Sequence, residues 1–126
     1  MPGVKRVAIL GASSERRKFG NKSLRAHRQA GWEVYAVNPG ESEIEGVRAY
    51  ASLAELPGPV ERVSVYLPPP LTRRLLPEIA AAGAGEVFFN PGAADPATIA
   101  EARRLGIPVV EACSIVDLGL RPSDFP

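Results

Sequence analysis

The chain has 126 residues, of which 45% are hydrophobic and 23% charged, and its formal net charge is +1. This length predicts one domain over residues 1–126, large enough to bury roughly two-thirds of the surface that the unfolded chain exposes. The near-zero net charge argues against a nucleic-acid partner, which would require a broad basic face. No run approaches the ~18 apolar residues of a membrane span, and the N-terminus leaves no room for a secretory signal. The sequence therefore predicts a soluble, cytoplasmic protein with no membrane partner.

Cysteine and histidine each occur once, as Cys113 and His27. A single cysteine excludes an internal disulfide, and this pair alone makes a zinc site improbable. No Ser, His and Asp set emerges at a recognisable spacing. The sequence thus predicts no metal site and no catalytic residue. Cys113 is interpreted as a small buried residue and His27 as a packing or surface residue.

A short apolar run at residues 7–10 predicts a central strand of a parallel sheet over residues 5–10, because the run is partly β-branched and ends at a glycine. The loop after it is built from small residues, namely Gly11, Ala12, Ser13 and Ser14. A helix beginning near Gly20 would point free N–H groups and the positive end of its dipole at this loop. Such a loop binds phosphate, although a tight connection without a ligand is the alternative interpretation.

Three cations follow the small-residue loop, at Arg16, Arg17 and Lys18. In a chain whose net charge is only +1, their proximity favours a polyanionic small-molecule ligand. The alternative is a solvated charged loop.

Alternating strands and helices are expected along the rest of the chain. Strands are predicted at residues 33–37, 62–67, 86–89 and 108–111, and helices at residues 21–30, 52–56, 71–82 and 96–105. Pro77 is expected to break the third of these helices into a short turn and a second helix. The prolines at residues 68–70 predict a stiff extended loop, and residues 41–51 a polar connection along the ligand edge.

This alternation without a hairpin signal predicts an α/β fold, a single Rossmann-like domain. Its five-stranded parallel sheet would have the order 3-2-1-4-5 and helices on both faces. Ligands of such sheets bind outside the carboxyl ends of the strands, at the switch point between the first and fourth strands. The loops at residues 11–14, 38–39, 67–69 and 90–92 are expected to converge there.

The dinucleotide NAD fits this crevice poorly for two reasons. The second and third glycine positions of the Gly-x-Gly-x-x-Gly fingerprint are Ser13 and Arg16. The acidic residue expected at the end of the second strand is replaced by Asn38. NADP is conceivable with the arginines.

Several segments together resemble the family of small stand-alone CoA-binding proteins. The matching segments are residues 7–14, residues 34–39, Gly46 with Tyr50, residues 52–53, residues 90–92 and residues 111–113. They extend over nearly the whole chain. The same fold is the N-terminal domain of the succinyl-CoA synthetase alpha subunit, in which a Tyr-Val-Pro-Pro-Pro-type segment is similar to residues 66–70 here.

The resemblance implies binding of coenzyme A or an acyl-CoA without chemistry of the chain's own. The small-residue loop would approach the diphosphate, and the three cations would neutralise the 3′-phosphate or the diphosphate. Other implied contacts are Asn38 and Pro39 beside the adenosine, Tyr66, Leu67, Pro68 and Pro69 along the adenine or the pantetheine arm, and Asn90 and Gly92 at the border of the crevice.

One departure from the family pattern concerns a lysine that often follows the Asn-Pro pair, where this chain has Gly40 and Glu41. The change is expected to weaken polyanion binding unless Arg48 compensates. Two alternatives stay open at this point: an NAD(P)-linked oxidoreductase or acyl-CoA synthetase component, and a ligand-free interaction domain. A homodimer or a partner subunit is also left open.

Overall fold

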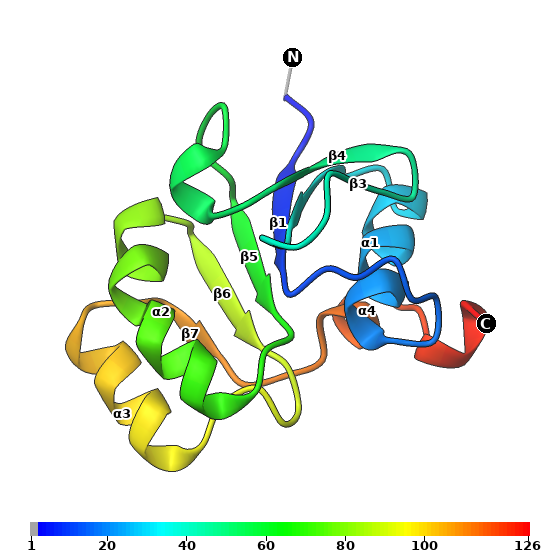
Figure 1. Ribbon diagram of the computed structural model, residues 1–126. Helices are drawn as coiled ribbons and strands as arrows, with labels where there is room; N and C mark the ends of the chain where they lie inside the picture. The colour runs from blue at the N-terminus through cyan, green and yellow to red at the C-terminus, as the bar shows by residue number, and fades with distance from the viewer. Residues whose placement is uncertain (1–2) are drawn as a thin grey trace.

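The computed structural model describes residues 3–126, which form a seven-stranded sheet in the order β3-β4-β2-β1-β5-β6-β7 (Figure 1). The strands are β1 (Arg6–Leu10), β2 (Glu33–Val37), β3 (Glu43–Ile44), β4 (Val47–Tyr50), β5 (Arg62–Val65), β6 (Glu86–Phe89) and β7 (Val109–Val110). The helices are α1 (Phe19–Gln29), α2 (Pro69–Ala82), α3 (Pro96–Arg104) and α4 (Ser114–Asp117), with 3-10 turns η1 (Leu53–Glu55) and η2 (Pro122–Asp124). The longest helix described has 14 residues, and none is long and apolar enough to cross a bilayer.

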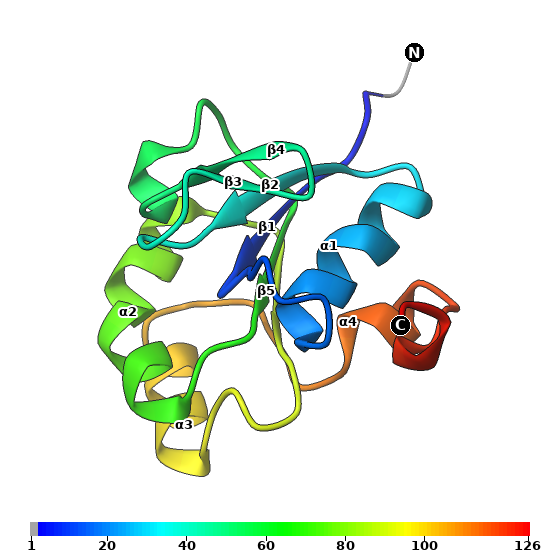
Figure 2. The same cartoon turned by 45° about the vertical axis from the view of Figure 1, so that its right-hand side comes forward.

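Helices cover both faces of the sheet, as predicted. Figures 1 and 2 show α2 and α3 on one face and α1 and α4 on the other. Strand β1 lies between β2 and β5 and pairs with both in parallel. Its central residues are completely buried because both of its faces are covered, which explains the unbroken apolar run.

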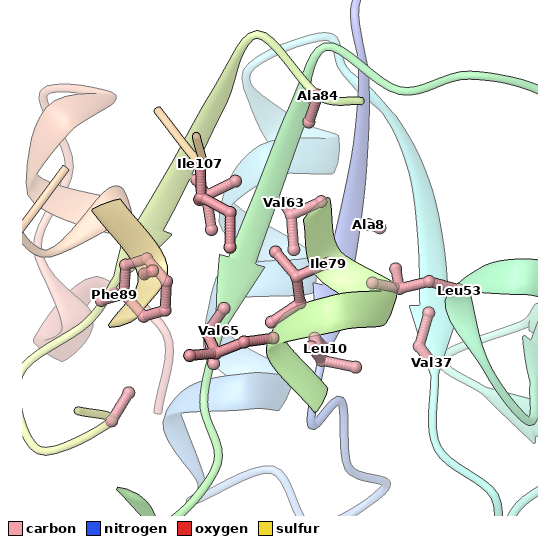
Figure 3. Close-up of a cluster of buried hydrophobic side chains, with 14 of the residues drawn as sticks. Ala8, Leu10, Val37, Leu53, Val63, Val65, Ile79, Ala84, Phe89 and Ile107 are labelled. Carbon is pink, nitrogen blue, oxygen red and sulfur yellow. The ribbon is translucent and has the colours of Figure 1, made fainter. Parts of the chain in front are cut away.

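The core is divided between the two faces by the alternation of side chains along β1. Ala8 and Leu10 belong to the larger cluster beneath α2 and α3, part of which Figure 3 shows with Val63, Val65 and Ile79. The neighbouring β1 residues at positions 7 and 9 pack into a smaller cluster on the α1 side. The C-terminal segment adds a third cluster against α1.

The predicted five-stranded parallel sheet of order 3-2-1-4-5 is wrong in strand number and order, because residues 41–51 are not merely a connection. They contain the antiparallel hairpin β3–β4, and β4 pairs in parallel with β2. The strand predicted at residues 62–67 therefore lies beside β1 and not beside β2, and the sheet is mixed. The hairpin turns at Glu45 and Gly46, which both have positive φ. Its strands are short and carry few buried apolar residues, so the sequence shows no alternating apolar pattern that would predict them.

The proline-rich segment also differs from the expectation. Pro68 caps α2, and Pro69 and Pro70 are its first two residues, so only the entry to the helix is extended. Proline suits these positions because the first N–H groups of a helix have no partner within it. Pro77 lies inside α2 without breaking it. Its ring is exposed, and burial of Leu76 and Ile79 on the opposite side holds the helix against the sheet.

Candidate functional site

The carboxyl ends of β1, β2, β5 and β6 lie at one edge of the sheet, since these strands are parallel. The connection from β1 leads to one side of the sheet and that from β5 to the other, so the switch point lies between these two strands. The predicted order had placed the switch point between β1 and the strand at residues 86–89. In the structure β5 lies beside β1, and the strand at residues 86–89, β6, lies on the far side of β5. This edge is where ligands of such folds bind.

A pocket of about 400 Å³ opens at this edge. Its lining includes four residues proposed from the sequence, Gly11, Asn38, Pro39 and Leu67. The remaining walls are Leu10, Val37, Ala51, Ser52, Leu71, Leu75 and Glu78. The α2 residues among them were missed because the helix was expected to break, although their spacing of four and three residues was a helical signal. The pocket is largely apolar, with polar groups at few points.

Two glycines allow the loop after β1 to pack closely. Gly11 has a φ of +93°, and a Cβ there would lie 2.5 Å from the carbonyl oxygen of Tyr66. A Cβ on Gly20, in the first turn of α1, would overlap the carbonyl oxygen of Gly11. Both positions therefore require glycine. The role of Gly20 was missed, and its signal was a glycine inside a helix, where propensity disfavours it.

Side-chain amides hold the small-residue loop from both sides. Asn21 donates to the carbonyl oxygen of Ser13 at 2.9 Å, and Asn38 donates to that of Ala12 at 2.8 Å. The Ser13 hydroxyl accepts from the N–H of Glu15 at 3.0 Å. Ala12 and Ser13 are buried, whereas Ser14 is exposed. The loop backbone is thus fixed without a ligand, and Ser14 presents its hydroxyl to solvent.

The three cations after the loop are exposed, and two of them have acidic partners. Arg16 pairs with Glu45 at 3.3 Å, and Lys18 pairs with Glu15 at 2.8 Å. Within residues 3–126, Arg17 makes no ion pair. A hydrogen bond from Asn21, together with the charge of Arg16, lowers the pKa of Glu45. Arg17 is therefore the member of this group whose charge is not engaged by a neighbouring carboxylate.

The residues that replace the family lysine bring a carboxylate to the loop. Gly40 donates to the Asn38 side chain at 2.7 Å, and the turn that results carries Glu41 back to the backbone N–H of Ser14. Arg48 lies over the ring of Tyr50, 4.8 Å from its centroid, on β4. The structure gives no contact of Arg48 with the small-residue loop.

Tyr66 and Asn90 turn toward the opposite side of the sheet. The Tyr66 hydroxyl lies 2.9 Å from the Ser114 hydroxyl, and the Asn90 amide donates to the Ser64 hydroxyl at 2.9 Å. Burial raises the pKa of Tyr66. Both side chains border a second cavity, while Gly92 lines a third hollow. The predicted site residues are therefore split between different cavities of the same edge.

A buried polar cluster extends from these serines to His27. Arg62 donates to Nε2 of His27 at 3.2 Å, and Nδ1 of His27 donates to the carbonyl oxygen of Ser23 at 2.8 Å. Arg62 also pairs with Glu86 and Asp117, each at 2.7 Å. Burial lowers the pKa of His27 to about 4, so this ring is neutral near pH 7. His27 is a packing residue, and no group of three His, Cys, Asp or Glu residues within residues 3–126 could hold a metal ion.

Known proteins are similar to this chain over most of its length. A family model described as a CoA binding domain matches residues 5–119. The alpha subunit of the ADP-forming acetate–CoA ligase II of Pyrococcus furiosus is 34% identical over 90 residues, which are 68% of this chain and 19% of that subunit. The chain spans less than half the length of the curated relatives it matches.

Solved structures share the fold over most of the chain. A conserved hypothetical protein from Pyrococcus furiosus superposes with a TM-score of 0.82 at 31% identity, covering 90% of this chain and 98% of that one. A Thermus thermophilus protein gives a TM-score of 0.82 at 34% identity, with 90% and 87% coverage. The mixed, predominantly parallel sheet is thus a Rossmann-like α/β fold that also occurs in other proteins of similar size.

Proposed function

This chain belongs to the family of CoA-binding domains, and on that premise we propose that it binds coenzyme A or an acyl-CoA at the carboxyl edge of its sheet. One observation carries the proposal: an apolar pocket of about 400 Å³ adjoins a loop whose glycine has no room for a side chain. Packing of Gly11 against the Tyr66 carbonyl fixes this small-residue loop at the carboxyl edge, and a loop between a strand and a helix N-terminus is a common phosphate site. The ligand would extend along this edge, where the proposed residues border neighbouring cavities.

The parts of coenzyme A match the parts of the site. The adenosine would enter the apolar pocket, where Leu71 and Leu75 offer packing and Asn38 and Ser52 offer polar contacts. The diphosphate would lie along the loop of residues 11–14 and accept hydrogen bonds from the N–H groups of Ser13 and Ser14, since those of Gly11 and Ala12 already donate to backbone carbonyls. Arg17 would neutralise phosphate charge, since its guanidinium has no carboxylate partner among residues 3–126.

The lining of the first pocket, within the described residues 3–126, contains neither histidine nor cysteine. The one histidine is buried, neutral near pH 7 and hydrogen-bonded to Arg62 and Ser23. We therefore propose that the domain binds its ligand without catalysis. A chain of this kind would also serve as the CoA-binding component of a larger acyl-CoA ligase, a second candidate favoured by the similarity to a ligase alpha subunit.

Calorimetric titration tests the proposal with coenzyme A, dephospho-CoA, NAD and NADP as ligands. We expect saturable binding of coenzyme A, and weaker binding in the Arg17→Ala variant. Arg103→Ala is the matched control, because Arg103 is an exposed arginine on α3, away from the pocket. Absence of heat and of a thermal shift at millimolar coenzyme A would overturn the proposal. Tighter binding of NADP than of coenzyme A would favour an oxidoreductase.

The ligase alternative needs a different measurement. Mixing the purified chain with an ATP-dependent partner subunit of an ADP-forming ligase should yield a complex and acyl-CoA formation only if the chain is a ligase component. A chain that binds coenzyme A but forms no such complex acts as a binding protein alone.

A further inference from the structure

A second cavity lies across the end of β5 from the first pocket. It has a volume of about 210 Å³. Its lining residues are Phe19, Tyr66, Asn90, Pro91, Cys113 and Pro122. Tyr66 borders this cavity and the next residue, Leu67, borders the first pocket. The two cavities are therefore separated by consecutive residues of one strand exit, with Gly11 packed against that exit.

The polar groups on the walls of this cavity already have partners. The Tyr66 hydroxyl is hydrogen-bonded to Ser114, and the Asn90 amide oxygen accepts from the N–H of Ser114 at 2.8 Å. The Asn90 amide nitrogen donates to Ser64 and to the carbonyl oxygen of Val65. Aromatic and proline carbons and one thiol make up the remaining walls. A polar ligand group that enters the cavity would lose its hydrogen bonds to water and find no free partner on the walls. The cavity therefore favours an apolar group.

The position of the cavity relates it to the proposed ligand. In open parallel sheets a dinucleotide lies across the switch point, with one half on each side. With the diphosphate on the loop of residues 11–14 and the adenosine in the first pocket, the other arm of the ligand passes over residues 66–67. That path leads to the second cavity.

We propose that the second cavity receives the acyl group of a short-chain, apolar acyl-CoA thioester, an inference that rests on the proposed function. Its volume is below the ~300–1,000 Å³ of pockets that hold drug-sized ligands, which suits a short chain and not a whole nucleotide. Phe19 lies at the start of α1 with 56% of its surface exposed, and an acyl chain in the cavity would cover part of this ring.

Acetyl-CoA and butyryl-CoA test the proposal as a matched pair, because they differ by two methylene groups alone. Each buried methylene strengthens binding roughly fourfold, so we expect butyryl-CoA to bind about fifteenfold more tightly than acetyl-CoA. Cys113→Leu, which adds bulk to the cavity wall, should abolish the difference between the two ligands. Cys113→Ala, which removes bulk, should keep it.

The single cysteine provides a second readout. Neither thioester has a free thiol that would consume iodoacetamide, so the alkylation rate of Cys113 can be followed by mass spectrometry at saturating ligand. Butyryl-CoA should slow the alkylation more than acetyl-CoA. Equal affinities and equal alkylation rates overturn the acyl site while coenzyme A binding stands. Failure of coenzyme A and both thioesters to bind overturns the proposed function, and the acyl site with it.

Discussion

The carboxylate of Glu41 accepts a hydrogen bond from the backbone N–H of Ser14 at a distance of 2.9 Å. Backbone N–H groups of a loop between a strand and a helix are donors for anions. In the ligand-free protein, one of these donors is therefore occupied by an anion of the chain itself. A phosphate that binds there must displace Glu41 and then lies close to its negative charge.

Neutralising this carboxylate should strengthen binding of coenzyme A. Glu41→Gln keeps an oxygen that can accept from Ser14 but removes the charge, so we expect a gain of about 1 kcal/mol, roughly fivefold in Kd. Glu41→Lys should give a larger gain, because it adds a cation beside the phosphates. Calorimetric titration measures both, and raising the salt concentration should reduce both gains.

Glu43→Gln is the matched control for this prediction. Glu43 is an exposed carboxylate on β3, two residues from Glu41, and it does not contact the loop. Equal effects of the two neutralisations would mean that general charge, and not the contact with Ser14, controls binding.

Gly20→Ala should destabilise the protein even though alanine is the better helix former. The added Cβ would overlap the carbonyl oxygen of Gly11, which belongs to rigid backbone. Overpacking of this kind costs about 1–3 kcal/mol, more than the ~1 kcal/mol that alanine gains over glycine in a helix. Chemical denaturation should show the loss. Binding of coenzyme A should weaken as well, because the loop must shift.

Gly58→Ala provides the comparison for Gly20→Ala. A Cβ at Gly58 would meet only the Arg6 guanidinium, at 3.8 Å, which is an ordinary contact. A loss of stability in Gly58→Ala as large as in Gly20→Ala would contradict the close packing of α1 on the loop.

The sequence predicted α1, α3 and the central strands because their apolar patterns are set by burial, whereas it predicted a break in α2 and did not predict the four-residue helix α4. It did not reveal β4, which lies between β3 and β2, because this short strand has a single buried residue and carries polar residues such as Arg48. Because β4 was missed, the predicted order placed the strand at residues 62–65 beside β2, whereas it pairs with β1. Pairing between strands depends on the whole set of strands, which local patterns do not specify.

The candidate site was predicted in part for a similar reason. The small-residue loop and the residues at positions 38 and 39 follow strand ends, so topology alone brings them together. The ion pairs of Arg16 with Glu45 and of Lys18 with Glu15 were not predictable, because turns of the backbone bring these carboxylates to the cations. Tyr66 leaves the sheet and points to the α1 side, a direction that depends on the packing of Ser114 beneath it.

Pro77→Ala should stabilise the protein. Proline at this position leaves the carbonyl of Arg73 without its intrahelical donor, and proline inside a helix is about 3 kcal/mol less favourable than alanine. The greater freedom of alanine in the unfolded chain offsets about 1 kcal/mol. We expect a gain of about 2 kcal/mol in the free energy of unfolding, measured by urea denaturation.

Pro96→Ala is the control, because Pro96 is the first residue of α3 and its missing N–H would have no partner in any case. This change should give no gain. A loss of stability in Pro77→Ala would show that the exposed proline ring packs usefully and that our account of α2 is wrong.

The stability of the protein should fall in mild acid because His27 resists protonation when folded. Burial, assisted by the positive charge of Arg62, lowers the pKa of His27 from 6.5 to about 4. Between these values the unfolded chain binds a proton that the folded chain does not, so the free energy of unfolding decreases as the pH falls from about 6.5 to about 4. The full decrease from this group is about 3 kcal/mol.

Denaturation of the wild type and of His27→Gln over this pH range isolates the effect. The variant cannot titrate at this position, so its stability should depend less steeply on pH, while the carboxylates affect both proteins alike. His27 is the only histidine, and its ring resonances in an NMR titration report its pKa directly. Parallel pH profiles, or a measured pKa near 6.5, would mean that the ring is hydrated and that the contact with Arg62 does not form.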